Sequence, residues 1–97
     1  MKYTITFSPE AREDYEVLPA YVRAAVRDGI DKHLQHGPVR ESKSRIKRLR
    51  GLEKPEYRLR VGDVRVFYDV RDEAVEVLGI VSKKNAEEWL KRRGVKS

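Results

Sequence analysis

Residues 56–70 read EYRLRVGDVRVFYDV, and this stretch decides the fold. Two runs of alternating apolar and polar residues flank Gly62-Asp63, a two-residue connection that glycine at the first position suits. A turn at these residues fixes which residues lie opposite each other on the two strands. We therefore predict a β-hairpin with these facing pairs: Val61 and Val64, Arg60 and Arg65, Leu59 and Val66, Arg58 and Phe67, Tyr57 and Tyr68.

The two faces of this hairpin differ in chemistry because side chains alternate with period two. One is an apolar core face: Tyr57, Leu59, Val61, Val64, Val66 and Tyr68. The other carries Arg58, Arg60 and Arg65, and a like-charge pair directly across two strands destabilises a sheet. An anionic ligand would relieve this repulsion. The alternative is a solvated face paired with acids from a loop or the tail.

Composition and length narrow the class of protein. The 97 residues are expected to form a single domain, 1–97, and the absence of cysteine excludes disulfides and thiolate metal sites. The first residues lack the apolar run of a signal peptide or membrane span, so we expect a soluble, cytoplasmic protein without a membrane partner.

Positive charge is concentrated in one segment. The net charge is +6, and residues 40–65 hold ten Lys and Arg against four acids, an excess equal to that of the whole chain. Such a block favours a polyanionic partner, most often nucleic acid, over a merely solvated face. We expect RNA or ribosome contacts from the basic loop residues Lys43, Arg45, Lys47, Arg48 and Arg50.

The remaining elements surround the hairpin. We predict a strand over 2–7, a helix from about Pro9 with Ser8 before it, and a second helix from about Ala20 to the stop at Gly37-Pro38. Short strands are expected around 46–49 and over 74–81, and a terminal helix over 86–93 with Asn85 as its N-cap. The order predicts an α+β domain: an N-terminal strand, a two-helix hairpin on one face of a small antiparallel sheet, and a short C-terminal helix.

Few other residues suggest chemistry. His33 and His36 fall near the end of the second helix, where they favour the helix dipole, and we expect no metal site and no cofactor. Trp89 is either a packing residue at the end of the sheet or a platform that stacks on a base.

The segment YRLRVGDVRVFYDV, preceded by KRLRG, resembles the RelE/ParE superfamily of type II toxin-antitoxin toxins over nearly the whole chain. The resemblance implies a RelE-like fold and one of two activities. RelE-like members are ribosome-dependent endoribonucleases that cut messenger RNA, whereas ParE-like members inhibit DNA gyrase. The fold alone does not choose between them, and a module that binds RNA without cleaving it is a third possibility.

The RelE-type mechanism implies specific residues in this chain. The 2′-hydroxyl attacks the adjacent phosphate, so cations must hold the developing charge, and Arg58, Arg60 and Arg65 match the basic positions of RelE-like toxins. Those toxins also carry an arginine after the last strand and a tyrosine near the C-terminus, where this chain has Lys83-Lys84 and then Trp89. Lys83 or Lys84 in its neutral form is the first choice of proton acceptor, with Glu56 or Asp63 behind.

The resemblance also implies partners. We expect a cognate antitoxin, an acidic and partly disordered chain that covers the basic face or displaces the terminal helix. The ribosome and messenger RNA would be the targets, with DNA gyrase as the alternative, and operator DNA would be bound only through the antitoxin complex.

Overall fold

The computed structural model describes residues 2–96, and its central element is the predicted hairpin. The elements in chain order are β1 (Thr4–Phe7), α1 (Pro9–Glu16), α2 (Ala20–Gly29), the π-helical turn η1 (Ile30–Leu34), β2 (Ile46–Arg48), β3 (Leu52–Lys54), β4 (Tyr57–Val61), β5 (Val64–Arg71), β6 (Ala74–Ser82), α3 (Lys83–Arg93) and β7 (Val95–Lys96). All five predicted facing pairs of β4 and β5 are confirmed. Gly62 has φ +56°, the left-handed conformation that a two-residue hairpin turn requires and glycine adopts without strain.

Five strands form the main sheet in the order β1-β6-β5-β4-β2. The sheet is mixed, because β1 pairs with β6 in parallel while the other pairs are antiparallel. The prediction of a small antiparallel sheet holds for the other pairs and is corrected at the β1 edge. Two helices separate β1 from the later strands, and a connection of that length allows a parallel pair.

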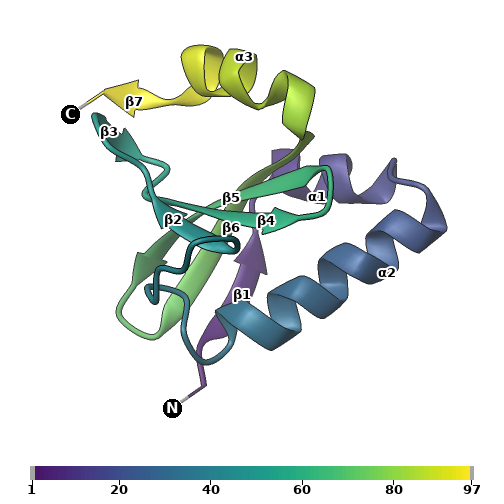
Figure 1. The fold of residues 1–97 in the computed structure, drawn as a ribbon, viewed down its shortest axis with the longest axis horizontal. Helices are drawn as coiled ribbons and strands as arrows, with labels where there is room; N and C mark the ends of the chain where they lie inside the picture. The colour runs from purple at the N-terminus through teal and green to yellow at the C-terminus, as the bar shows by residue number, and fades with distance from the viewer. Residues whose placement is uncertain (1, 97) are drawn as a thin grey trace.

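The core lies between the sheet and the helices α1, α2 and η1, which Figure 1 shows together on one side of the sheet. Val26 of α2 and Ile30 and Leu34 of η1 point inward at the predicted spacing of four residues, in one core with Leu59 and Val66 of β4 and β5. The α+β class and the helix hairpin on one sheet face are confirmed. We call the opposite face of the sheet the outer face; it carries Arg58, Arg60, Arg65, Phe67 and Asp69.

The C-terminal helix α3 covers part of this outer face. It begins at Lys83 with Ser82 at the N-cap, three residues before the predicted start at Ala86, so Asn85 lies within the helix. Trp89 stacks on Phe67 with ring centroids 4.9 Å apart and an interplanar angle of 10°. A Cβ at Gly79 would lie 2.3 Å from Cζ2 of Trp89, so only glycine fits beneath the indole. The outer face is therefore not open along its whole length.

A second, two-stranded sheet closes the structure beyond the main one. β3 pairs with β7 in an antiparallel arrangement, which joins the basic segment to the end of the chain (Figure 1). The sequence analysis did not predict either strand. Within residues 2–96, no helix is both long and apolar enough to cross a membrane.

Candidate nucleic-acid interface

The register of three neighbouring strands gathers basic side chains at one end of the outer face. Arg60 lies opposite Arg65 on β5, and the Arg60 amide donates to the Arg45 carbonyl at 2.8 Å on the other side. In the next row, Lys47 of β2 lies opposite Arg58, which lies opposite Phe67. Side chains at facing positions share a face of the sheet. We call this set the basic face: Lys47, Arg58, Arg60 and Arg65.

Arg65 is the most buried charge of the basic face, with 6% of its surface exposed. Its guanidinium donates to backbone carbonyls, to Gly62 at 2.9 Å and to Val64 at 3.2 Å. Burial lowers the pKa of Arg65, and the positive charges of Arg58 and Arg60 lower it further, while Asp63 opposes them. Because arginine nevertheless remains charged at neutral pH, the fold holds a desolvated cation beside two others.

Within the described part of the chain, no acid neutralises these arginines. None of the ion pairs among residues 2–96 involves Arg58, Arg60 or Arg65. The Nε of Arg58 is buried without a hydrogen-bond partner, and so is the hydroxyl of Ser82. Buried donors are nearly always satisfied in folded proteins. The unsatisfied Nε of Arg58 and the three guanidinium groups, which form no ion pair within residues 2–96, are therefore suited to an anion with several oxygens.

The start of α3 borders the basic face. Val64 lies opposite Ser82 in the sheet, and the Lys83 amide donates to the Asp63 carbonyl at 2.6 Å. These contacts bring Lys83 and Lys84 to the hairpin turn, where they line a cavity of about 500 Å³ with Asp63 and Ser82. The partial positive charge of a helix N-terminus adds to that of the two lysines. The structure thus places both lysines close to the Arg65 end of the basic face.

The other basic residues of the 40–50 segment separate into two groups. Lys47 belongs to the basic face, and Arg45 borders it through its backbone carbonyl. Arg48 turns to the core side, where it donates to the Tyr57 hydroxyl at 3.1 Å and lies over the Tyr57 ring. Arg48 is therefore not part of the basic face. Lys43 and Arg50 are exposed in the loops on either side of β2.

Trp89 has a structural role in this arrangement. Only 9% of its surface is exposed, and its ring covers Phe67 and Gly79. Stacking of Trp89 on a base stays a prediction, and in this structure the ring is packed within the protein. Of the two interpretations of this residue, packing at the end of the sheet is the one the structure supports.

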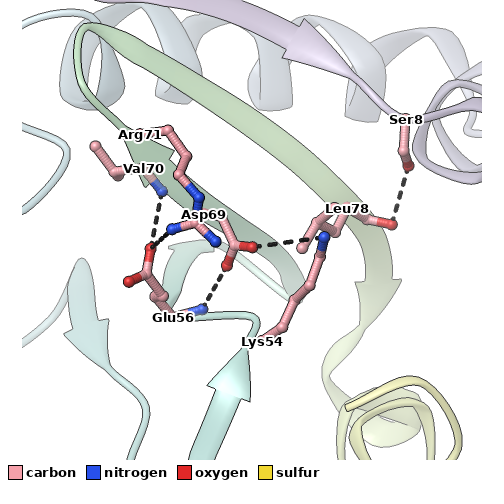
Figure 2. Close-up of polar contacts among 7 residues, drawn as sticks. All are labelled: Ser8, Lys54, Glu56, Asp69, Val70, Arg71 and Leu78. Atoms are coloured by element: carbon pink, nitrogen blue, oxygen red, sulfur yellow. Dashed lines mark hydrogen bonds and ion pairs between the residues drawn. The ribbon is translucent and has the colours of Figure 1, made fainter. Parts of the chain in front are cut away.

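The far end of the outer face carries a carboxylate cluster that the sequence analysis missed: Lys54, Glu56, Asp69 and Arg71. The Glu56 amide donates to Asp69 Oδ1 at 2.8 Å, and the Val70 amide donates to Glu56 Oε1 at 3.1 Å (Figure 2). Lys54 lies 3.9 Å from Asp69, and Arg71 lies 3.7 Å from Glu56. The sequence contained the signal, because Glu56 and Asp69 would be the next facing pair beyond Tyr57 and Tyr68 in the predicted register. Glu56 is tied to this end and is not available as a base beside the arginines.

Comparisons with known proteins agree with this architecture. The model of a protein family described as "ParE toxin of type II toxin-antitoxin system, parDE" matches residues 5–87. The chain belongs to this family. No curated protein sequence matches it. It is thus a RelE/ParE superfamily toxin of a type II toxin-antitoxin system, as the hairpin motif predicted.

Solved structures of the superfamily share the fold. The toxin-antitoxin complex RelBE2 from Mycobacterium tuberculosis contains a chain with TM-score 0.70 and 28% identity, covering 84% of this chain and 99% of that one. The archaeal RelE-RelB complex from Pyrococcus horikoshii OT3 gives a TM-score of 0.69 and 26% identity, covering 86% of this chain and 97% of that one. A mutant of E. coli toxin RelE in the free state gives a TM-score of 0.72 at 23% identity, covering 96% of this chain and 99% of that one, and shows similarity of fold alone.

Proposed function

We propose that this toxin is a ribosome-dependent endoribonuclease that cuts messenger RNA and so inhibits translation. The basic face is the observation that carries the proposal. It holds three arginines without an acidic partner, one of them buried, at the positions that match the basic residues of RelE-like toxins. Holding an unpaired, desolvated cation costs stability, and a binding partner that brings negative charge offsets that cost.

The proposed reaction is an internal transfer at one phosphate of the message. The ribose 2′-oxygen attacks the adjacent phosphorus, the bond from phosphorus to the 5′-oxygen breaks, and the products carry a cyclic phosphate and a 5′-hydroxyl. Negative charge grows on the phosphate oxygens in the transition state, and Arg58, Arg60 and Arg65 stabilise it with bidentate hydrogen bonds. No metal is needed, because the guanidinium groups supply the charge.

The proton of the 2′-hydroxyl passes to an acceptor, and the leaving 5′-oxygen takes one up. Lys83 and Lys84 are the proposed residues for this transfer, since the link between Lys83 and Asp63 holds the start of α3 next to Arg65. A neutral amine accepts a proton and an ammonium donates one, so either lysine can act on either side of the reaction. Electrostatic stabilisation by the arginines supplies most of the rate in this scheme.

Inhibition of DNA gyrase is the second function, and two observations favour it. The description of the matching family names the ParE toxin. In addition, Trp89, which this chain has where RelE-like toxins carry a tyrosine, is packed on Phe67 rather than directed to a substrate. In this case the basic face is a binding surface without catalysis.

A cognate antitoxin is the proposed protein partner. Several similar structures are described as complexes of RelE with RelB, or of YoeB with YefM. An acidic segment that covers the basic face would pair Arg58, Arg60 and Arg65 with carboxylates and exclude RNA. This mode of inhibition requires no change in the fold of the toxin.

The test is expression from a tightly controlled promoter, with the 5′ ends of a translated reporter message mapped and plasmid supercoiling measured in the same cells. We expect new 5′ ends in register with codons, and a loss of cleavage of about 10²–10³-fold in Arg65→Ala. Arg12→Ala removes an equal charge from the exposed face of α1 and serves as the matched control. Growth arrest with intact message and altered supercoiling would instead assign the protein to gyrase inhibition.

A further inference from the structure

A second cationic site lies beside the edge strand β2, near the end of η1. It is a cavity of about 290 Å³ whose charged and polar lining includes Lys32, His33, His36, Arg40, Ser42 and Arg45. Among residues 2–96, no acidic residue lines it. Three permanent cations and two histidines thus surround one cavity, which we call the histidine cavity.

Two turns that are anchored to the rest of the protein hold these side chains. The buried Tyr68 hydroxyl donates to the Pro38 carbonyl at 2.6 Å, and the Arg40 amide donates to the Gly37 carbonyl at 3.1 Å. In the next turn, the Ser42 hydroxyl accepts from the amides of Arg45 and Ile46 at 3.0 and 3.3 Å. The backbone positions of Arg40 and Arg45 are therefore fixed before any ligand binds, which reduces the entropy cost of binding.

The nearby acids are engaged elsewhere. Asp31 accepts from the Gln35 side chain and lines a different cavity, and Glu41 accepts from the Arg48 amide. None of the ion pairs of residues 2–96 involves Lys32, Arg40 or Arg45. Burial lowers the pKa of His33, and the charges of Arg45 and Lys32 lower it further. Positive charge in the cavity is thus left uncompensated.

We propose that the histidine cavity is a second phosphate subsite, which binds the sugar-phosphate backbone of RNA that also crosses the basic face. The inference rests on the proposed function, since it names a further contact of the same ligand. Arg45 joins the two sites: it lines the cavity, and its carbonyl accepts from the Arg60 amide. A strand of RNA that leaves the basic face over β2 reaches the cavity next.

The chemistry of the lining selects an anion. Two histidines three positions apart can bind a transition metal, but Lys32, Arg40 and Arg45 repel a metal cation. A phosphate takes hydrogen bonds from arginine, lysine, hydroxyl and protonated imidazole together. Bound phosphate also favours the imidazolium form of His33, so RNA binding and protonation of His33 strengthen each other by the same factor.

The first measurement is an NMR titration of the imidazole protons of His33 and His36 in the full-length protein. The probe is a short single-stranded 2′-O-methyl RNA, which cannot be cleaved because its 2′-hydroxyls are blocked. We expect the pKa of His33 to rise by about one unit with RNA, a tenfold increase in proton affinity. Inorganic phosphate should move the same signals less, and polyglutamate at equal ionic strength should leave them nearly unchanged.

The second measurement is the salt dependence of RNA affinity. Arg40→Gln should weaken binding and lower the slope of log affinity against log salt by about 0.7, the value for one phosphate contact on a single strand. Arg12→Gln makes the same charge change on α1 and should leave the slope as in the wild type. His33→Asn should reduce the strengthening of binding between pH 8 and pH 6, with His36 left as the remaining imidazole of the cavity.

The outcomes separate this inference from the proposed function. The subsite is overturned if the NMR signals of His33 do not change with RNA and Arg40→Gln binds RNA like Arg12→Gln. This holds even where the message is still cleaved. An equal or larger response to polyglutamate also overturns the RNA subsite, because the cavity then binds an acidic protein partner. Failure of the wild-type protein to bind RNA, with phosphate still shifting His33, refutes both the nucleic-acid assignment and the proposed function.

Discussion

The two ends of the outer face hold buried charge in opposite ways. At one end Asp69, 2% exposed, receives a hydrogen bond from the Glu56 amide and lies near Lys54 (Figure 2). At the other end Arg65, 6% exposed, donates to the backbone carbonyls of Gly62 and Val64, lies opposite Arg60, and forms no ion pair within residues 2–96. The stacked rings of Phe67 and Trp89 lie between them.

This difference distinguishes a structural charge from a functional one. Partners within the chain satisfy Asp69, which fastens the start of β4 to β5 and requires nothing from outside. The arginine end lacks such partners, and a buried charge without a counter-ion destabilises the folded state. Both ends lie on the same strand, β5, so the contrast arises from their partners and not from the local fold. The expected effects of substitutions follow from it.

Removal of the Trp89 ring, which stacks on Phe67 between the two ends, should have the largest effect on stability. Trp89→Ala leaves a void over Phe67 and Gly79, and we expect the free energy of unfolding to fall by about 3 kcal/mol. Denaturant unfolding followed by circular dichroism measures this change. Trp89→Phe keeps an apolar ring at the same site and should lose much less. A Trp89→Ala protein of undiminished stability that no longer binds RNA would restore the base-stacking role.

Arg65→Met should separate stability from function at the arginine end. The substitution keeps most of the side-chain volume and removes the desolvated charge, so we expect the free energy of unfolding to rise by about 1 kcal/mol. RNA binding and toxicity should be lost in the same variant. Thermal unfolding and a growth assay, run in parallel with the stability-neutral control Arg12→Met, measure both. A clear loss of stability in Arg65→Met would make Arg65 a structural residue like Asp69.

The sequence was sufficient to predict that Arg58, Arg60 and Arg65 share one face, because the pattern that places them is local to the hairpin. The turn at Gly62-Asp63 and the period-two alternation were sufficient to pair Arg60 with Arg65 and to place Leu59 and Val66 in the core. The same register could have revealed the Glu56–Asp69 contact one step further on. An alternation pattern assigns a face to a carboxylate, but it does not say that a backbone amide will bind it.

Long-range contacts account for what the sequence did not predict. α3 can cover Phe67 because Gly79 leaves room for the Trp89 ring. This contact depends on how α3 packs on the sheet, which no local pattern in the sequence indicates. The helix starts at Lys83 despite two cations in its first turn, a position that the helix dipole disfavours. The pairing of β3 with β7 joins residues more than forty positions apart, and neither strand has a sequence pattern long enough to identify it.

The smallest expected effect is a pH dependence at the carboxylate end. Burial raises the pKa of Asp69 above its ordinary 3.8, and the charge of Glu56 adds to this, against the opposing Glu56 amide, Lys54 and Arg71. The folded protein therefore binds a proton at pH values where the unfolded chain has released it. The contribution to stability is present below the ordinary pKa and is lost as pH rises through the raised one.

Asp69→Asn isolates this contribution. The amide oxygen of asparagine still accepts from the Glu56 backbone, so the link between β4 and β5 survives while the titrating group is removed. We expect the free energy of unfolding of the variant to decline less than that of the wild type as pH rises from 3.8 through the raised pKa. Asp69→Ala, which leaves the Glu56 amide without a partner, should lose about 2 kcal/mol at every pH. Identical pH profiles for wild type and Asp69→Asn would mean that Asp69 titrates normally, and would remove the contrast with Arg65.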